Sequence, residues 1–240
     1  MVFNMNFITV DSYEKLSEMA AEIICNQVIN KPESILGLAT GSSPVGTYKK
    51  MAEANKEGKV DFSKVISVNL DEYVGLTGDN DQSYRYFMDN NLFKFINIKP
   101  ENTFVPNGCA EDLAKEGADY DEHIKKLGGI DLQLLGIGLD GHIGFNEPDD
   151  FFTAPTHEVE LDPSTIEANA RFFESMDDVP KTAITMGMMS IMQAKKILLI
   201  ANGQNKKDII NKSFFGPITP QVPASILQLH PDVTVIFSEK

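Results

Sequence analysis

The sequence has 240 residues, and 21 Lys or Arg stand against 35 Asp or Glu, which gives a formal net charge of −14. This charge argues against nucleic acid and anionic membranes as partners. The 42% of hydrophobic residues is typical of a globular chain, and no apolar run is long enough to span a bilayer. Cys25 and Cys109 lie far apart and the N-terminus lacks a secretory signal pattern, so we expect a cytoplasmic protein.

Short apolar runs alternate with longer amphipathic stretches along the chain. In chain order we expect a strand at 7–10, a helix at 11–30, a strand at 35–39, a helix at 44–55, a strand at 65–70, a helix at 83–93, a short strand near 103–106, a helix at 110–127, strands at 130–138, 183–186 and 196–202, a helix from Asn205 and a strand at 233–237. Asp11 and Glu14 resemble a capping box, and residues 71–82 are expected to be irregular.

This alternation predicts an α/β fold, in which one domain spanning residues 1–240 holds a mostly parallel, Rossmann-like, doubly wound sheet with helices on both faces. No linker, repeat or low-complexity tract divides the chain. In such sheets ligands bind at the carboxyl ends of the strands. Functional residues are therefore expected just after strands.

The first informative strand end is LATGSSPVGTY, residues 38–48. A strand that runs into hydroxyl residues and a helix started by Pro44 presents backbone N–H groups at a helix N-terminus, which suits an anion such as phosphate. The alternative is that Ser42 or Ser43 only caps the helix. The segment has neither the Walker pattern nor the dinucleotide-binding pattern, so ATP and NAD are weakly supported.

Two carboxylates follow the third expected strand. Asp71 and Glu72 come directly after it, where the rule for open sheets places groups that face a ligand. A carboxylate there could act as a general base. The alternative is a loop acid that caps the next helix.

The most informative segment is LLGIGLDGHIGFNEP, residues 134–148, which has four glycines within nine positions. His142 lies between Asp140 and Glu147 in this glycine-rich loop. Flanking carboxylates can fix the imidazole tautomer and hold its pKa near the working pH. A Ser-His-Asp triad stays open by sequence order alone, although the nucleophile-elbow pattern G-x-S-x-G is absent.

Together these strand ends offer a phosphate cradle, a candidate base and an acid–histidine–acid group. That combination favours proton-transfer chemistry on a phosphorylated small molecule. The sequence shows no metal-ligand spacing and no cofactor motif, so we expect neither a metal nor a cofactor. It does not choose between a monomer and a homo-oligomer.

Five motifs, in order and at compatible spacing over nearly the whole chain, resemble the glucosamine-6-phosphate deaminases. They are TGSSP at 40–44, NLDEY at 69–73, NDQSYRYFM at 80–88, LGIGLDGHIGFNEP at 135–148 and PASILQLHP at 223–231. The related 6-phosphogluconolactonases have a similar Asp-Gly-His turn but typically continue with a different sequence than Asn146-Glu147-Pro148.

The resemblance implies conversion of glucosamine 6-phosphate and water to fructose 6-phosphate and ammonia. His142 would assist opening of the pyranose ring by moving a proton at the ring oxygen, and Asp140 and Glu147 would orient and polarise it. Asp71 would then remove the C2 proton and return it at C1 through an enol-type intermediate. The residues themselves agree, because these two steps need two acid–base centres.

The resemblance also assigns the substrate phosphate. The family's contacts map onto Thr40, Gly41, Ser42, Arg171 and Lys206. For Arg171 the alternative is a surface helix charge, although its fork geometry suits a phosphate. For Lys206 the choice against the adjacent Lys207 stays open.

One segment departs from the family pattern. Regulated hexameric members carry a serine- and basic-rich stretch after the equivalent of Pro148 that helps bind the activator N-acetylglucosamine 6-phosphate. Here residues 149–161 contain Asp149, Asp150 and Glu158 and no Lys or Arg, and the chain stops at Lys240 without those members' extension. We therefore expect an enzyme without allosteric activation.

Residues 149–180 are expected to act as a lid over the substrate, a hypothesis that rests on position alone. Two other functions remain open at this point. One is a 6-phosphogluconolactonase, and the other is a non-catalytic sugar-phosphate sensor. The sensor is disfavoured because the chain keeps the full acid–base set and has no spare N-terminal segment for a DNA-binding module.

Overall fold

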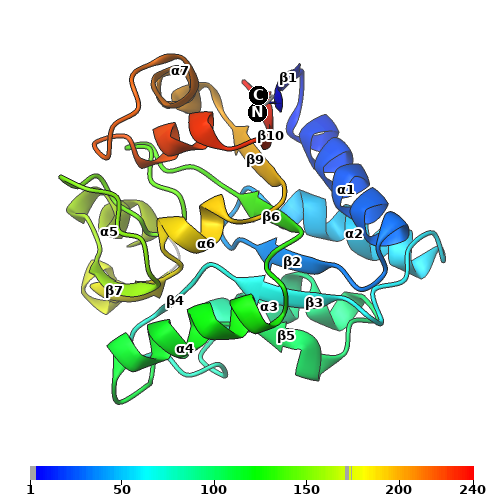
Figure 1. Cartoon of the computed structure of the whole chain (residues 1–240), viewed down its shortest axis with the longest axis horizontal. Helices are drawn as coiled ribbons and strands as arrows, with labels where there is room; N and C mark the ends of the chain where they lie inside the picture. Colours follow the sequence, from blue (N-terminus) through cyan, green and yellow to red (C-terminus); the bar gives the residue numbers. More distant parts are fainter. Residues whose placement is uncertain (1–3, 171–172, 174) are drawn as a thin grey trace.

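The computed structural model describes residues 4–170, 173 and 175–240, and its centre is a seven-stranded parallel sheet (Figure 1). The strand order is β1-β10-β9-β6-β2-β3-β5. The strands are β1 (Asn4–Val10), β2 (Ile35–Leu38), β3 (Ile66–Asn69), β5 (Thr103–Phe104), β6 (Leu132–Leu135), β9 (Ile197–Asn202) and β10 (Asp232–Ser238). Every residue of the central strands β2 and β6 is buried, which fits the apolar sequence of β2 and, apart from Gln133, that of β6. The expected fold class is confirmed.

A smaller antiparallel sheet lies beside the main one. Its strands are β4 (Asp71–Tyr73), β8 (Thr182–Thr185) and β7 (His157–Glu160), in that order. The chain passes from β3 to β4 with only Leu70 between them. Asp71 therefore stands where the two sheets meet, opposite Thr185 of β8.

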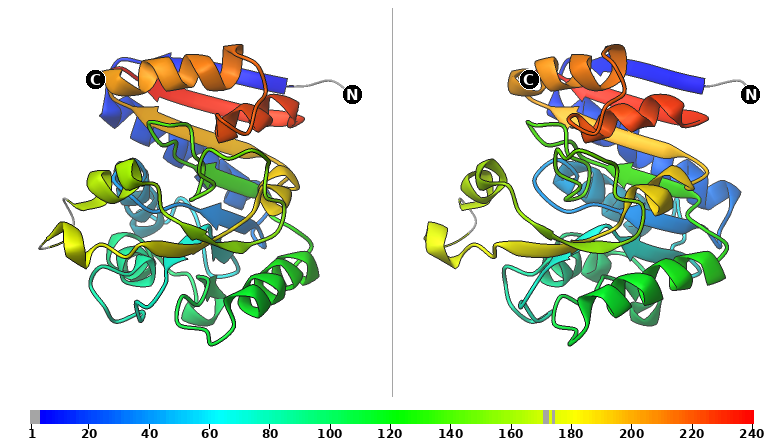
Figure 2. Two further views of the ribbon diagram at one scale, coloured as in Figure 1. Left: turned by 90° about the vertical axis from the view of Figure 1, so that its left-hand side faces the viewer. Right: turned by 60° about the vertical axis from the view of Figure 1, so that its left-hand side comes forward.

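Helices cover both faces of the main sheet (Figures 1 and 2). They are α1 (Tyr13–Asn30), α2 (Val45–Lys56), α3 (Tyr84–Asn91), α4 (Leu113–Lys126), α5 (Pro163–Asn169), α6 (Met188–Met192) and α7 (Lys207–Phe215). Short 3-10 helices occupy Phe93–Phe95, Pro100–Asn102, Met176–Asp178, Gln204–Lys206 and Pro223–Leu229. The pair α1 and α2 packs on one face, whereas α4, α6 and α7 lie on the other. Within the described residues, no helix is long and apolar enough to cross a membrane.

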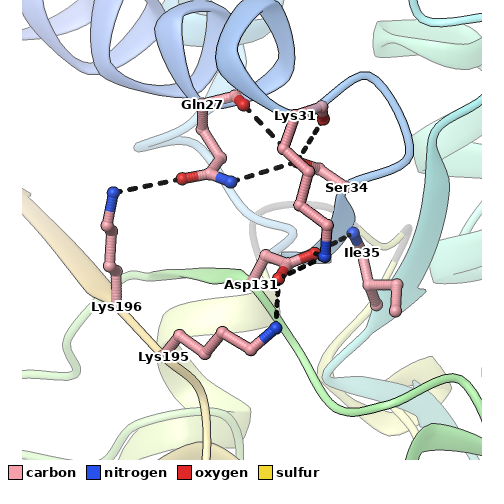
Figure 3. A network of polar contacts seen from close by, with 7 residues as sticks. All are labelled: Gln27, Lys31, Ser34, Ile35, Asp131, Lys195 and Lys196. Carbon is pink, nitrogen blue, oxygen red and sulfur yellow. Dashed lines mark hydrogen bonds and ion pairs between the residues drawn. The ribbon is translucent and has the colours of Figure 1, made fainter.

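An ion-pair network ties the amino-terminal edge of the main sheet together (Figure 3). Asp131, just before β6, is only 2% exposed, and its oxygens accept hydrogen bonds from Lys31 Nζ at 2.7 and 2.8 Å and Lys195 Nζ at 2.6 Å. A third donor is the backbone N–H of Ile35, at 2.8 Å. One carboxylate thus joins the end of α1 to the starts of β2 and β6 and to the residues before β9. This edge lies opposite the strand ends expected to carry function.

Several local predictions were wrong. Residues 71–73 are not irregular but form β4, and β7 was not expected, because a three- or four-residue strand is stabilised by partners distant in sequence. The expected strand at 130–138 covers only 132–135, since glycines follow it. The first helix is capped by Ser12 rather than by Asp11, and the Ser12 hydroxyl accepts a hydrogen bond from Lys15 N.

Candidate functional site

A cavity of about 310 Å³ opens at the carboxyl ends of four adjacent strands, β9, β6, β2 and β3. Segments that follow these strands supply most of its wall, as expected for an open parallel sheet. Seven of the nine predicted site residues line it: Thr40, Gly41, Ser42, Asp71, Asp140, His142 and Lys206. Glu147 does not line the cavity but contacts His142, which does. Arg171 lies outside the described residues.

His142 is held between two carboxylates. Its Nδ1 atom lies 2.8 Å from Oδ1 of Asp140 and 3.1 Å from Oε2 of Glu147. Asp140 also accepts a 3.1 Å hydrogen bond from the backbone N–H of His142, which closes the loop around the ring. Both contacts fix Nδ1 as the protonated nitrogen that faces the carboxylates.

The two carboxylates also set the charge of the imidazole. Burial alone would lower the pKa of His142, but the hydrogen bonds and charges of Asp140 and Glu147 outweigh it and raise the pKa to about 9. Burial likewise opposes ionisation of Asp140, yet the hydrogen bond from His142 holds the pKa of that carboxyl well below its usual value. At neutral pH His142 is therefore an imidazolium held between two carboxylates, and it can donate a proton.

Asp71 and Glu72 are neighbours in the chain with different surroundings. Asp71 lines the cavity and is 6% exposed, and burial together with the charge of Glu72 raises its pKa to about 7. Glu72 accepts hydrogen bonds from the backbone N–H groups of Tyr73, Tyr84 and Arg85 at 2.8–2.9 Å, and so it caps the start of α3. The sequence left a base and a helix cap as alternatives for this pair, and the structure has one residue in a position for each.

The glycine-rich loop turns at Gly144, where its backbone packs closely against Thr185 and Asp71. Gly144 has a φ of +59°, and a Cβ there would lie 2.9 Å from Thr185 Oγ1 and 3.6 Å from Asp71 Oδ2. Thr185 accepts the backbone N–H of Phe145 at 3.0 Å, and the Asn146 amide donates to the carbonyls of Ile143 and Met186. These bonds hold the loop of His142 against the strand that faces Asp71.

The segment 40–46 turns sharply into α2. Gly41 has a φ of +91°, a conformation that glycine adopts readily. The hydroxyl of Tyr13 in α1 contacts the carbonyl oxygens of Ser42 and Ser43 at 3.1 and 3.0 Å and accepts the N–H of Gly46 at 2.9 Å. This brace places the turn and the N-terminus of α2 beside the cavity, where an anion is favoured.

The two adjacent lysines have different partners. Lys206 lines the cavity, and its Nζ donates a 2.7 Å hydrogen bond to the carbonyl of Ile137 in the glycine-rich loop. Lys207 lies 2.8 Å from the carboxylate of Glu239 on the surface. Of the two, only Lys206 stands where a bound anion could reach it.

Three polar residues of the cavity wall were given no role from the sequence: Tyr84, Thr165 and Asn205. Tyr84 is stacked on Phe145, with 5.9 Å between the ring centroids, and it lies in the NDQSYRYFM motif, which could have indicated it. Thr165 comes from α5, inside the expected lid, and Asn205 immediately precedes Lys206. No local pattern around Thr165 indicates a role.

By distance alone, Asp140, His142 and Glu147 could also hold a metal ion, since one ligand atom from each lies within 4.8 Å of the others. Such an ion would have to replace the Nδ1 proton that both carboxylates now share. The hydrogen-bonded arrangement explains the geometry with the groups already present.

Comparisons with known proteins identify the family of the chain. The family model of glucosamine-6-phosphate isomerases and 6-phosphogluconolactonases matches residues 11–236. The chain belongs to this family. It is 65% identical over 232 residues to a glucosamine-6-phosphate deaminase of Lachnoclostridium phytofermentans, covering 97% of this chain and 98% of that one. A Clostridium perfringens protein of the same name is 54% identical over 235 residues, covering 98% and 97%.

Solved structures separate the two branches of the family. A monomeric glucosamine-6-phosphate deaminase superposes with a TM-score of 0.95 at 44% identity, covering 98% of this chain and 97% of that one. The 6-phosphogluconolactonase of Trypanosoma cruzi has a TM-score of 0.75 at 19% identity, covering 99% and 96%. At that identity the lactonase likeness shows the shared fold alone.

Proposed function

We propose that this chain converts glucosamine 6-phosphate and water to fructose 6-phosphate and ammonia. The observation that carries the proposal is that two separate acid–base centres, Asp71 and the His142 group, border one cavity. Opening the sugar ring and moving a proton between its carbons each require such a centre. The names of the relatives at 54% and 65% identity support the same reaction.

In the first step His142 donates a proton to the ring oxygen O5 as the C1–O5 bond breaks. The neutral imidazole then takes the proton of the O1 hydroxyl as the C1=O1 bond forms, which releases the open-chain aldehyde and restores the imidazolium. The imidazolium is the acid this step needs, and a pKa of about 9 keeps it protonated at neutral pH. Asp140 and Glu147 hold the ring by Nδ1, which leaves Nε2 as the nitrogen for proton transfer.

In the second step Asp71 removes the C2 proton and returns it to C1. The electron pair of the C2–H bond forms the C1=C2 bond of an enol bearing the amine, as the carbonyl oxygen O1 takes a proton from the His142 imidazolium. Return of the proton from Asp71 to C1 gives a C2 iminium ion. Water adds to C2, ammonia leaves, and the proton released as the C2 carbonyl forms returns to His142, so the atoms and protons of substrate and water balance those of the products. A pKa of about 7 suits a carboxylate that must accept a proton and return it near neutral pH.

We assign the substrate phosphate to the turn Thr40, Gly41 and Ser42 with Lys206, and to Arg171. The N-terminus of α2 and the Lys206 ammonium supply positive potential to the cavity of a chain whose net charge is −14. Lys206 is preferred over Lys207 because the latter pairs with Glu239.

The proposal extends to the chain as a whole. Residues 1–240 would act as one domain with residues 149–180 as a lid, without allosteric activation. The enzyme would be a hydrolase of amino-sugar breakdown, including N-acetylglucosamine degradation, and would work in the cytoplasm.

Incubation with glucosamine 6-phosphate, with ammonia and fructose 6-phosphate as readouts, tests the proposal. Stoichiometric release of both products supports it. Hydrolysis of 6-phosphogluconolactone without ammonia release would identify a lactonase instead. Binding of the sugar phosphate without turnover would identify a sensor.

A further inference from the structure

The hydroxyl of Thr165 connects α5 to the catalytic histidine. Thr165 is only 5% exposed, and its Oγ1 donates a 2.8 Å hydrogen bond to Oε1 of Glu147. The other oxygen of the same carboxylate, Oε2, lies 3.1 Å from Nδ1 of His142. One carboxylate therefore bridges a helix of the expected lid and the proposed ring-opening acid.

This bond is not an ordinary feature of a helix start. A threonine in the first turn commonly bonds to its own helix or to water. Here the backbone N–H of Thr165 donates to the carbonyl of Asp162, while its hydroxyl donates to a loop eighteen residues earlier in the sequence. The side chain also lines the cavity beside His142.

A second contact docks the same segment. The ring of Phe173 lies edge-on to Tyr73, with 5.9 Å between the centroids. Tyr73 belongs to β4, next to Glu72 and Asp71. Packing alone could hold the segment near the site, but of these two contacts only the Thr165 hydroxyl reaches the carboxylate that orients His142.

We propose that Thr165 is a positioning residue that couples the docking of α5 to the orientation of Glu147, and through it to the His142 ring. The catalytic part of this inference rests on the proposed function. The coupling itself is a property of the fold and is reciprocal, so loss of Glu147 must loosen α5 as much as loss of the Thr165 hydroxyl does.

The test compares Thr165→Val, which keeps the branched shape and removes the donor, with Thr165→Ser, which keeps the donor. Thr165→Val should lower kcat for ammonia release about tenfold, roughly the contribution of one hydrogen bond to a charged group, with KM changed less than twofold. Thr165→Ser should restore most of kcat, and Glu167→Gln on the exposed side of α5 should change neither constant.

Hydrogen exchange of the amides in residues 163–169 gives a readout independent of activity. Exchange should rise in Thr165→Val and in Glu147→Ala, and no further in the double variant, because both remove the same bond. Additive increases, or a Val variant with wild-type kcat, would overturn the inference. If the wild type released no ammonia, the proposed function would fail, while non-additive exchange would still support the coupling.

Discussion

The backbone N–H of Tyr84 donates a 2.8 Å hydrogen bond to the carboxylate of Glu72, the neighbour of the proposed base Asp71. Through this bond a buried acid anchors the helix whose first residue forms a wall of the cavity. The same acid places a negative charge beside Asp71. Glu72 thus has both a structural and an electrostatic effect on the site.

Replacing Glu72 by Gln should separate these two effects. The wild-type profile of kcat/KM should be bell-shaped, rising through about pH 7 as Asp71 ionises and falling through about pH 9 as His142 loses its proton. In Glu72→Gln, Asp71 stays buried but loses the neighbouring negative charge, so the pKa of Asp71 should fall. The acidic limb should therefore move to lower pH, and the alkaline limb, which His142 sets, should not move.

The same variant should be less stable by about 1–3 kcal/mol, because a neutral amide cannot accept all three N–H groups. Kinetics across pH and chemical denaturation measure the two effects. Glu22→Gln on the exposed side of α1 serves as the control. An unmoved acidic limb would show that the charge of Glu72 does not act on the base.

The adjacent lysines offer a matched pair for the phosphate assignment. Lys206→Met should raise KM for glucosamine 6-phosphate at least tenfold, since one charge-assisted hydrogen bond contributes roughly 1.5–3 kcal/mol. Lys207→Met removes only the exposed ion pair with Glu239 and should leave KM within twofold. Steady-state kinetics at one ionic strength measure both, and equal effects would contradict the assignment to Lys206.

The network at the opposite edge of the sheet should matter for stability alone. Asp131→Ala removes the acceptor of Lys31, Lys195 and the Ile35 N–H, and it should cost about 2–4 kcal/mol, since the lysines are half exposed. Denaturant unfolding measures this loss, and kcat should not change. Asp119→Ala, an exposed acid of α4, is the control.

The stability difference should also depend on pH. Burial alone would raise the pKa of Asp131, but the hydrogen bonds from Lys195, Lys31 and Ile35 lower it below its ordinary value. A carboxyl whose folded pKa is lowered stabilises the protein above its unfolded pKa and stops doing so as pH falls through the folded pKa. The stability difference between wild type and Asp131→Ala should therefore begin to shrink as pH falls below about 4, the ordinary pKa of an aspartate, and should continue to shrink down to the lower folded pKa. A constant difference down to pH 2 would refute this account.

Allosteric activation is not expected. The stretch after Pro148 carries Asp149, Asp150 and Glu158, whose negative charges would oppose a second sugar phosphate. Saturation curves for glucosamine 6-phosphate should be hyperbolic and unchanged by N-acetylglucosamine 6-phosphate. Sigmoidal curves that become hyperbolic with that compound would show regulation.

The sequence predicted what depends on neighbours in the chain. Apolar runs indicated the parallel strands, and the residues after them lie together because carboxyl ends of parallel strands share one edge. The residue pattern alone could not divide the roles of base and helix cap between Asp71 and Glu72, and the base was assigned to Asp71 only by the family resemblance. In the structure Glu72 is the residue that accepts backbone N–H groups at the start of α3. The residue pattern also could not distinguish Lys206 from Lys207, because Glu239, which pairs with Lys207, is distant in sequence.

The pairing of β4 with β8 and the contact from Thr165 to Glu147 were missed for the same physical reason. Each joins segments separated by many residues, and neither leaves a periodic signal in the local sequence. Phosphate binding by Arg171 stays a prediction, because that residue lies outside the described part of the chain.

The most direct test of the central claim is the initial rate of ammonia release from glucosamine 6-phosphate by the wild type and by Asp71→Asn. The wild type should release ammonia and fructose 6-phosphate in equal amounts. The Asn variant should still bind the substrate but release ammonia about 10² to 10⁴ times more slowly, the usual contribution of a general base. Undiminished ammonia release by Asp71→Asn, or none by the wild type, would contradict the account.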